Sequence, residues 1–229
     1  MVAAQDHPQI PGSRLSMETL ETLWTWSPFL LEGFGWNVLI AFTAGLIGLA
    51  LGVPLAYLMG AKTQMVAGMS KRASSVIHHL PTFALIFYMA MILPAEVSLP
   101  LVDTTMHIAT WFKVALALAA MQVGYVSSNF SIALRAWREG DVPKAMLFIP
   151  GWINGFLITA IASSNASVVG VNELISRCNT LIAATGQTGL MIPVYLYASL
   201  FFLVFCYPLT WVVGWLKKQL SDKVSARSR

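Results

Sequence analysis

Five long stretches without a charged residue make up most of this chain and strongly constrain the solvent in which it can fold. They are Gly33–Ala61, Ala73–Ala95, Val114–Leu134, Ala145–Asn172 and Cys178–Leu216. A helix needs about 20 apolar residues to cross the hydrocarbon core of a bilayer. Only 10% of the 229 residues are charged, whereas a soluble domain carries about 25%. We therefore predict that lipid surrounds most of the chain.

These stretches predict an all-α membrane protein with about five transmembrane helices. We place the helices near residues 35–59, 75–93, 113–136, 146–165 and 192–216. Trp24 and Trp26 suit the headgroup region, so residues 1–30 are expected to hold a short interfacial helix on the outer face. The chain would then consist of an N-terminal segment over 1–30, a five-helix transmembrane domain over 31–220 and a basic cytoplasmic tail over 221–229.

The positions of lysine and arginine predict the orientation of the chain. With five spans and a cytoplasmic C-terminus, 11 of the 14 basic residues lie inside, at Lys62, Lys71, Arg72, Arg135, Arg138, Lys144, Lys217, Lys218, Lys223, Arg227 and Arg229. Only Arg14, Lys113 and Arg177 remain outside or at span ends. Because cytoplasmic loops carry the excess of basic residues, we expect the N-terminus outside and the C-terminus in the cytoplasm.

The first predicted helix carries three glycines, Gly45, Gly48 and Gly52. Gly48 and Gly52 form a small-xxx-small step, which lets a second helix approach closely. That second helix could belong to this chain or to a partner subunit. In a chain with only five spans, a partner is at least as good an explanation as internal packing.

Uncharged polar residues gather on two of the predicted helices. Nine of them form the candidate substrate path: Gln122, Tyr125 and Asn129 on the third helix, and Asn154, Thr159, Ser163, Ser164, Asn165 and Ser167 on the fourth. Spacings of three and four place several of them on one face of each helix. A polar face at bilayer depth must meet another helix, a ligand or water. Interhelical hydrogen bonding and a solute path are equally good interpretations.

Motifs for catalysis, cofactors or metals are missing from the sequence. There is no nucleophile elbow and no phosphate-binding glycine loop. Cys178 and Cys206 are isolated, as expected of packing residues. His78 and His79 precede Pro81 at the start of the second predicted helix, and adjacent helical residues diverge too widely to chelate one ion. We expect no enzymatic activity, no cofactor, no metal and no nucleic-acid partner, with membrane lipid as the surroundings.

The segment Ile149–Leu174 carries a resemblance to a known family. It reads IPGWINGFLITAIASSNASVVGVNEL. This resembles the membrane subunits of type I polar amino-acid ABC importers, whose corresponding segment ends S-V-I-G-V-P-E-L. Here Ser167–Leu174 supplies that ending with Asn172 at the place of the proline. The likeness extends over about residues 30–220, although the Ser167–Leu174 block is its only specific part.

The resemblance implies a permease subunit of the bacterial inner membrane that moves amino acids or similar small polar solutes. Such a subunit pairs with a second permease, identical or different, around a shared path. It works with an ATP-binding subunit in the cytoplasm and a substrate-binding protein outside. ATP would then be bound by another chain, consistent with the lack of a phosphate loop here.

Two departures from the family pattern affect these expectations. The family's Glu-Ala-Ala coupling loop, which docks on the ATPase, is missing or degenerate. In its place stands the short cytoplasmic turn Arg138-Glu139-Gly140-Asp141-Val142-Pro143-Lys144. The family's Lys-Asp-Thr-Ser-Leu is replaced by Ile161–Asn165, which has no charge. We therefore expect ATPase contact to be weak or indirect.

Three functional hypotheses remain at this point. The first is a transport permease subunit, and the second is a permease-derived scaffold or regulatory subunit that does not transport. The third is a self-contained channel or ion-coupled carrier. It ranks last because such proteins place ionisable residues within the membrane, and the predicted spans hold almost none.

Overall fold

The fold is described from a computed structural model, which defines residues 12–99 and 104–227. The helices are α1 (Gly12–Met59), α2 (Gln64–His78), α3 (Thr82–Ile92), α4 (Thr110–Arg138), α5 (Val142–Met146), α6 (Phe148–Ala162), α7 (Leu174–Thr185) and α8 (Met191–Arg227). Two 3₁₀ segments, η1 (Ser163–Val169) and η2 (Thr188–Leu190), precede α7 and α8. The described part is therefore helical, as predicted, apart from one hairpin of β1 (Glu96–Leu99) and β2 (Thr104–His107), which the sequence analysis did not anticipate.

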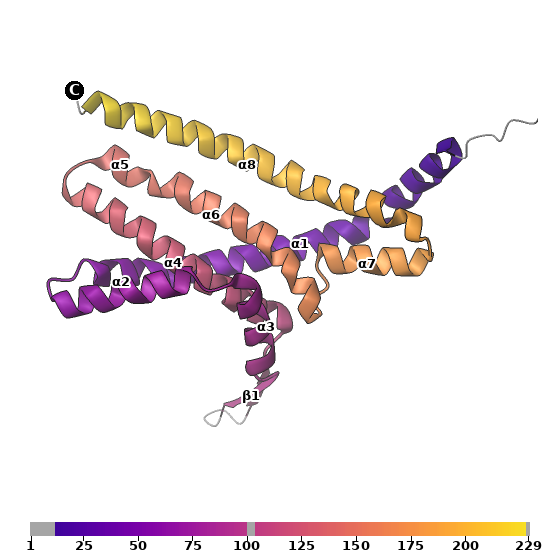
Figure 1. Cartoon of the computed structure of the whole chain (residues 1–229), viewed down its shortest axis with the longest axis horizontal. Coiled ribbons are helices and arrows are strands. Elements are labelled where there is room, and N and C mark those ends of the chain that lie inside the picture. The colour runs from indigo at the N-terminus through magenta and orange to yellow at the C-terminus, as the bar shows by residue number, and fades with distance from the viewer. Residues whose placement is uncertain (1–11, 100–103, 228–229) are drawn as a thin grey trace, which may run out of the picture.

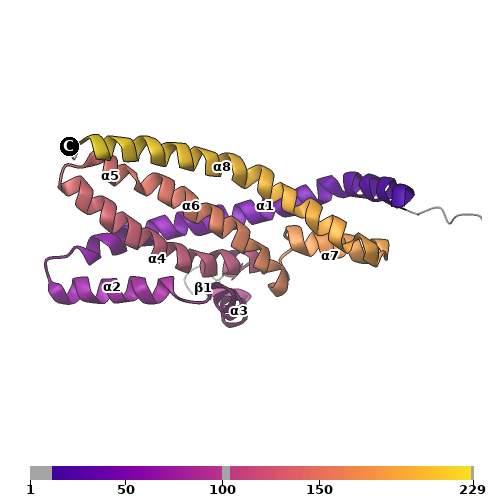
Figure 2. The same ribbon diagram turned by 45° about the horizontal axis from the view of Figure 1, so that its top comes forward.

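The long helices lie alongside one another in both views (Figures 1 and 2). α4 packs against α1 and α6, which also contact each other, and α6 packs against α8. α2 covers α1 and α4, whereas α7 packs on α1 and the beginning of α8. The α1–α2 connection, α5 and the C-terminal end of α8 therefore gather at one end of the bundle (Figure 1).

Three helical segments of the described chain are long and apolar enough to cross a membrane: Met17–Met59, Val142–Val169 and Thr188–Ser225. The bent pair α2 and α3 makes a fourth if it counts as one span. α4 is not among them, although it lies at the centre of the bundle. Its many buried residues touch other helices rather than lipid, so they need less hydrophobicity. The number of crossings, five, stays a prediction.

The second predicted helix, 75–93, is wrong as a single straight span. The structure divides this region into α2 and α3, whose axes differ by 93°. Pro81 is the N-cap of α3 and cannot continue a helix from α2, because it lacks the N–H and clashes with the preceding turn. His79 consequently caps the end of α2 rather than lying at the start of a span.

The N-terminal region differs from the separate interfacial helix that the sequence predicted. α1 runs without a break from Gly12 to Met59, with Pro28 and Pro54 inside it. The predicted segment 1–30 is therefore continuous with the first span from residue 12 onward, and its first eleven residues lie outside the described part. Whether it lies on the membrane surface remains a prediction.

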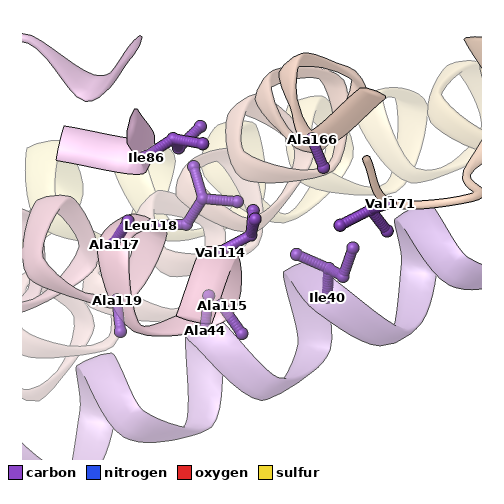
Figure 3. Close-up of a cluster of buried hydrophobic side chains, with 10 residues drawn as sticks. All are labelled: Ile40, Ala44, Ile86, Val114, Ala115, Ala117, Leu118, Ala119, Ala166 and Val171. Carbon is purple, nitrogen blue, oxygen red and sulfur yellow. The ribbon is translucent and has the colours of Figure 1, made fainter. Parts of the chain in front are cut away.

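Two clusters of buried apolar side chains hold the bundle together. In the first, Ile40 of α1, Ile86 of α3 and Leu118 of α4 meet Val171, which follows η1 (Figure 3). The second joins the N-terminal half of α1 to α7 and α8, and Cys178 is fully buried in it. Burial and then the charge of Glu173 raise the pKa of Cys178 to about 12. Cys178 therefore behaves as a small neutral packing residue, as predicted.

Candidate functional site

A buried polar cluster ties α1 to η1 and α7. The side-chain Nδ2 of Asn37, in α1, donates to Ser163 Oγ at 3.0 Å and to Glu173 Oε2 at 2.9 Å. The Asn37 Oδ1 accepts from the Leu174 N–H at 3.1 Å. All three of Asn37, Ser163 and Glu173 are fully buried. One amide thus connects α1 to two segments that lie 126 and 136 positions further along the chain.

Glu173 is the N-cap of α7 as well as a member of this cluster. Its two carboxylate oxygens accept from the N–H groups of Ile175 and Ser176, each at 3.0 Å. These bonds satisfy two of the free donors at the start of α7. Burial raises the pKa of Glu173 above its ordinary 4.5, and the hydrogen bonds from Asn37, Ile175 and Ser176 only partly oppose this effect. No described Lys or Arg forms an ion pair with Glu173, so neutral donors alone compensate for its burial.

One turn further along α7, Arg177 fixes the helix to the N-terminal half of α1. Its guanidinium binds both carboxylate oxygens of Glu32, at 2.7 and 2.8 Å, and the Phe29 carbonyl at 2.8 Å. It also lies 4.5 Å from the centre of the Phe29 ring. A Cβ on Gly33 would come within 2.6 Å of the Arg177 side chain. Gly33 therefore provides the space that this contact needs.

A pocket of about 270 Å³ opens beside Arg177. Its lining comes from α1, from the start of α4, from the connection between η1 and α7 and from α7 itself. It consists of Trp36, Thr110, Trp111, Gly170, Val171, Asn172 and Arg177. The rings of Trp36 and Trp111 are 5.9 Å apart. None of the nine candidate path residues lines this pocket.

Three of the candidate path residues connect α4 to α6. Gln122 Nε2 donates to Thr159 Oγ1 at 2.6 Å, and the Tyr125 hydroxyl donates to the Gly151 carbonyl at 3.0 Å. Gly155 permits this approach, because a Cβ there would lie 2.9 Å from the Tyr125 ring. These residues make hydrogen bonds between helices, which is one of the two interpretations that the sequence left open. The buried Gln122 Oε1 has no hydrogen-bond partner among the described atoms.

The remaining candidates are not gathered into the same site. Asn129 donates to a carbonyl of its own helix, and Ser167 donates to the Ser164 carbonyl within η1. Asn154 is exposed and Asn165 is half-buried. The structure thus divides the candidate path residues. Gln122, Tyr125 and Thr159 join α4 to α6, Ser163 belongs to the Asn37 cluster, and the others bond within their own helix or lie on an exposed face. Whether any of them contacts a solute stays a prediction.

The glycines of the first predicted helix pack within this chain. A Cβ on Gly48 would lie 2.4 Å from Gln122 Cβ, and one on Gly52 would lie 2.7 Å from Val126 Cβ. The helix that approaches Gly48 and Gly52 is therefore α4 of this chain, and not a helix of a partner subunit. Gly45 faces α6 at ordinary contact distance, 3.8 Å.

The predicted cytoplasmic turn is short in the structure. α4 ends at Arg138, Gly140 adopts a φ of +78°, and α5 begins at Val142. Asp141 caps α5 by accepting from the Lys144 N–H at 3.2 Å. The whole connection to α6 contains only the five-residue α5. Nothing longer projects from this end between α4 and α6.

Sequence reasoning missed Asn37, and it included Glu173 only as part of the Ser167–Leu174 block. A signal for Asn37 was present, because it is one of very few polar residues in the charge-free stretch Gly33–Ala61. A lone amide at that depth requires a buried partner. Its partner Glu173 lies 136 positions away, so the pair itself could not be found from local patterns.

This arrangement of long helices is also found in chains of two solved ABC transporters. Two solved structures show the similarity. A chain from the crystal structure of an amino acid ABC transporter with histidines matches with a TM-score of 0.67 and 16% sequence identity, over 86% of this chain and 96% of that chain. A chain of the MetNI methionine ABC transporter in inward-facing conformations matches with a TM-score of 0.52 and 13% identity, over 82% and 95%. No family model and no curated protein sequence matches this chain.

Proposed function

We propose that this chain is a permease subunit of an ABC-type importer for amino acids or similar small polar solutes in a bacterial inner membrane. The observation that carries the proposal is the fold shared with a chain of an amino acid ABC transporter over 86% of the residues. The subunit would pair with a second permease, identical or different, around a common path. An ATP-binding subunit and an extracytoplasmic substrate-binding protein would complete the assembly, and this chain itself would catalyse no reaction.

An exposed face of α6 that carries asparagine among apolar residues supports a shared path. Asn154, Ile158 and Ile161 are exposed on one face of α6, and Asn165 continues that face into η1. These residues belong to the candidate span Val142–Val169. An amide at this depth is costly against lipid, so water, a solute or a second subunit should cover it.

The alternative is a permease-derived subunit that scaffolds or regulates a complex without transport. The short connection through α5 favours it, since ATP-driven closure of a partner ATPase needs a projecting element on which to act. The uncharged Ile161–Asn165 favours it as well, because the family pattern has a charged pair there.

Uptake measurements with variants of the α6 face distinguish the two functions. Asn154→Leu and Asn165→Leu should each lower ATP-dependent uptake of a labelled polar amino acid by roughly tenfold, because a path would lose a hydrogen-bonding group. The assay uses vesicles that contain this chain with its permease, ATPase and binding-protein partners. Ser163 is unsuitable for this purpose, since its hydroxyl is already bound within the Asn37 cluster.

Ile158→Leu is the matched control, because it changes an exposed residue of the same face while keeping that residue apolar and its volume nearly the same. Its uptake should equal that of the wild type. Unchanged uptake in both asparagine variants, with an assembled complex, would favour the scaffold function. A chain that is dispensable for uptake would refute the permease proposal.

Pull-down experiments test how the ATPase is held. We expect this chain to retain the ATPase only when the second permease is present, because α5 offers five residues where a docking helix would stand. The second permease alone should retain the ATPase at wild-type levels. Strong, stoichiometric ATPase binding by this chain in the absence of its partner would contradict the expectation.

A further inference from the structure

A second pocket, of about 340 Å³, lies at the end of the bundle opposite α7. It lies between α1, α4, α5 and α6, and its lining includes Tyr57, Phe130, Ala133, Trp137, Ala145 and Phe148. The rings of Tyr57, Phe130 and Phe148 follow one another at 5.9 and 5.1 Å and form an aromatic wall. Apart from the Tyr57 hydroxyl and the indole N–H of Trp137, the lining side chains are apolar. The pocket therefore suits a hydrocarbon group.

The pocket opens toward the surroundings of the bundle. Trp137 is 61% exposed at its edge, and Met146 and Ile149 are also exposed there. Tryptophan is enriched at the level of the lipid headgroups. The edge of the pocket thus has the character of the boundary between hydrocarbon and headgroups.

Unpaired cations lie next to this edge. Arg138 follows Trp137 and extends toward the end of α1, where its Nη1 is 3.6 Å from the position of a Cβ on Gly60. Lys144 precedes the lining residue Ala145. Both side chains are exposed, and neither forms an ion pair within the described ranges 12–99 and 104–227.

The same end carries further basic residues. Lys217 and Lys218 are exposed on α8, which packs against α5. The turn also holds the carboxylates Glu139 and Asp141, but Asp141 is engaged as the cap of α5. A hydrocarbon pocket beside an excess of positive charge is complementary to one kind of molecule, an anionic lipid.

We propose that this pocket binds one acyl chain of an anionic phospholipid, whose phosphate lies against Arg138 and Lys144. The site does not depend on the transport function proposed above. The bound lipid holds the short α4–α5–α6 connection at the membrane surface. This connection contains only the five-residue α5.

Native mass spectrometry of the full chain in detergent tests the headgroup preference. Palmitoyl-oleoyl phosphatidylglycerol should be retained far better than phosphatidylcholine with the same acyl chains. Because each basic side chain near an anionic headgroup contributes about fivefold to binding, Arg138→Gln with Lys144→Gln should reduce that retention by roughly 25-fold. Lys71→Gln with Arg72→Gln removes the same charge from the exposed face of α2 and should leave retention unchanged.

Fluorescence quenching tests the place of the acyl chain. The fluorescence of Trp137 is obtained as the difference between the wild type and Trp137→Phe. Phosphatidylglycerol brominated on its acyl chain should quench this fluorescence. Ala133→Phe fills the pocket and should reduce the quenching. If Ala133→Phe does not fold, the loss of lipid retention in Arg138→Gln with Lys144→Gln tests the site independently. Equal retention of the two headgroups, or no quenching of Trp137, overturns the proposal. Either result would indicate that a protein partner or nothing fills the pocket.

Discussion

Replacing Glu173 with alanine should destabilise the protein by about 3 kcal/mol or more, because each of three donors left without an acceptor costs about 1–3 kcal/mol. The donors are the Asn37 side chain and the N–H groups of Ile175 and Ser176. We expect a lower unfolding temperature in detergent and a smaller monodisperse fraction on size-exclusion chromatography. Both effects would come from the same loss, because α7 and α1 would no longer share a bound carboxylate.

Two controls isolate this role. Glu173→Gln keeps one acceptor oxygen and should lose clearly less stability than Glu173→Ala. Glu18→Ala removes the same charge from an exposed position and should leave the unfolding temperature unchanged. An equal effect of Glu18→Ala and Glu173→Ala would show that net charge, rather than the buried network, is responsible.

The same carboxyl also predicts a pH dependence. Because burial raises the pKa of Glu173 above 4.5, the folded state holds its proton more tightly than the unfolded state. The contribution of Glu173 to stability is therefore complete below pH 4.5 and decreases as the pH rises through the folded-state pKa. Glu173→Gln should remove this part of the pH dependence in thermal unfolding curves recorded from low to neutral pH.

Gly48→Val should cost about 3 kcal/mol or more, because overpacking a rigid contact forces the backbones apart. A Cβ at this position would lie 2.4 Å from Gln122 Cβ and 3.2 Å from the Gln122 carbonyl carbon. The backbone carbon belongs to the body of α4 and cannot turn aside. Thermal unfolding and the yield of folded protein in the membrane would measure the effect.

Gly35→Val is the matched control on the same helix. A Cβ on Gly35 meets no atom within 4 Å, so the change should stay within about 0.5 kcal/mol. If Gly48→Val folds as well as Gly35→Val, then α1 and α4 are not in the close contact that the structure shows.

The parts of the fold that depend on local composition could be predicted from the sequence. The absence of charge located α1, α4, α6 and α8, and the short turn at Arg138–Lys144 followed from the lack of intervening residues. The Gly48–Gly52 step correctly indicated a close helix approach. It could not identify the approaching helix, because a glycine groove accepts any partner of suitable shape.

The errors arose where one local rule opposed another or where the contact was distant. Pro81 stands within an apolar stretch, and hydrophobicity was given more weight than the inability of proline to continue a helix. The bend between α2 and α3 was missed for that reason. The Asn37–Glu173 bond joins residues 136 positions apart, and no periodicity in a single sequence brings such residues together.

The candidate site was predicted only in part for a related reason. Polar residues in an apolar helix indicate that hydrogen-bond partners are needed. They do not indicate whether the partner is a neighbouring helix or a solute. Gln122 and Thr159 form a hydrogen bond with each other, whereas Asn154 has no hydrogen-bond partner among the described residues. Spacing along the chain could not separate these cases, because the distinction depends on which helix lies opposite.

The length of α1 has a consequence for how the two sides of the membrane communicate. At 1.5 Å per residue, its 48 residues make a rod of about 72 Å, whereas the oily interior of a bilayer is only about 30 Å thick. A rod of this length reaches beyond the lipid unless it is strongly inclined, and its N-terminal portion is held by Arg177 and α7. A force applied to that portion would act on the same continuous helix that carries Gly48, with no intervening loop to absorb the movement.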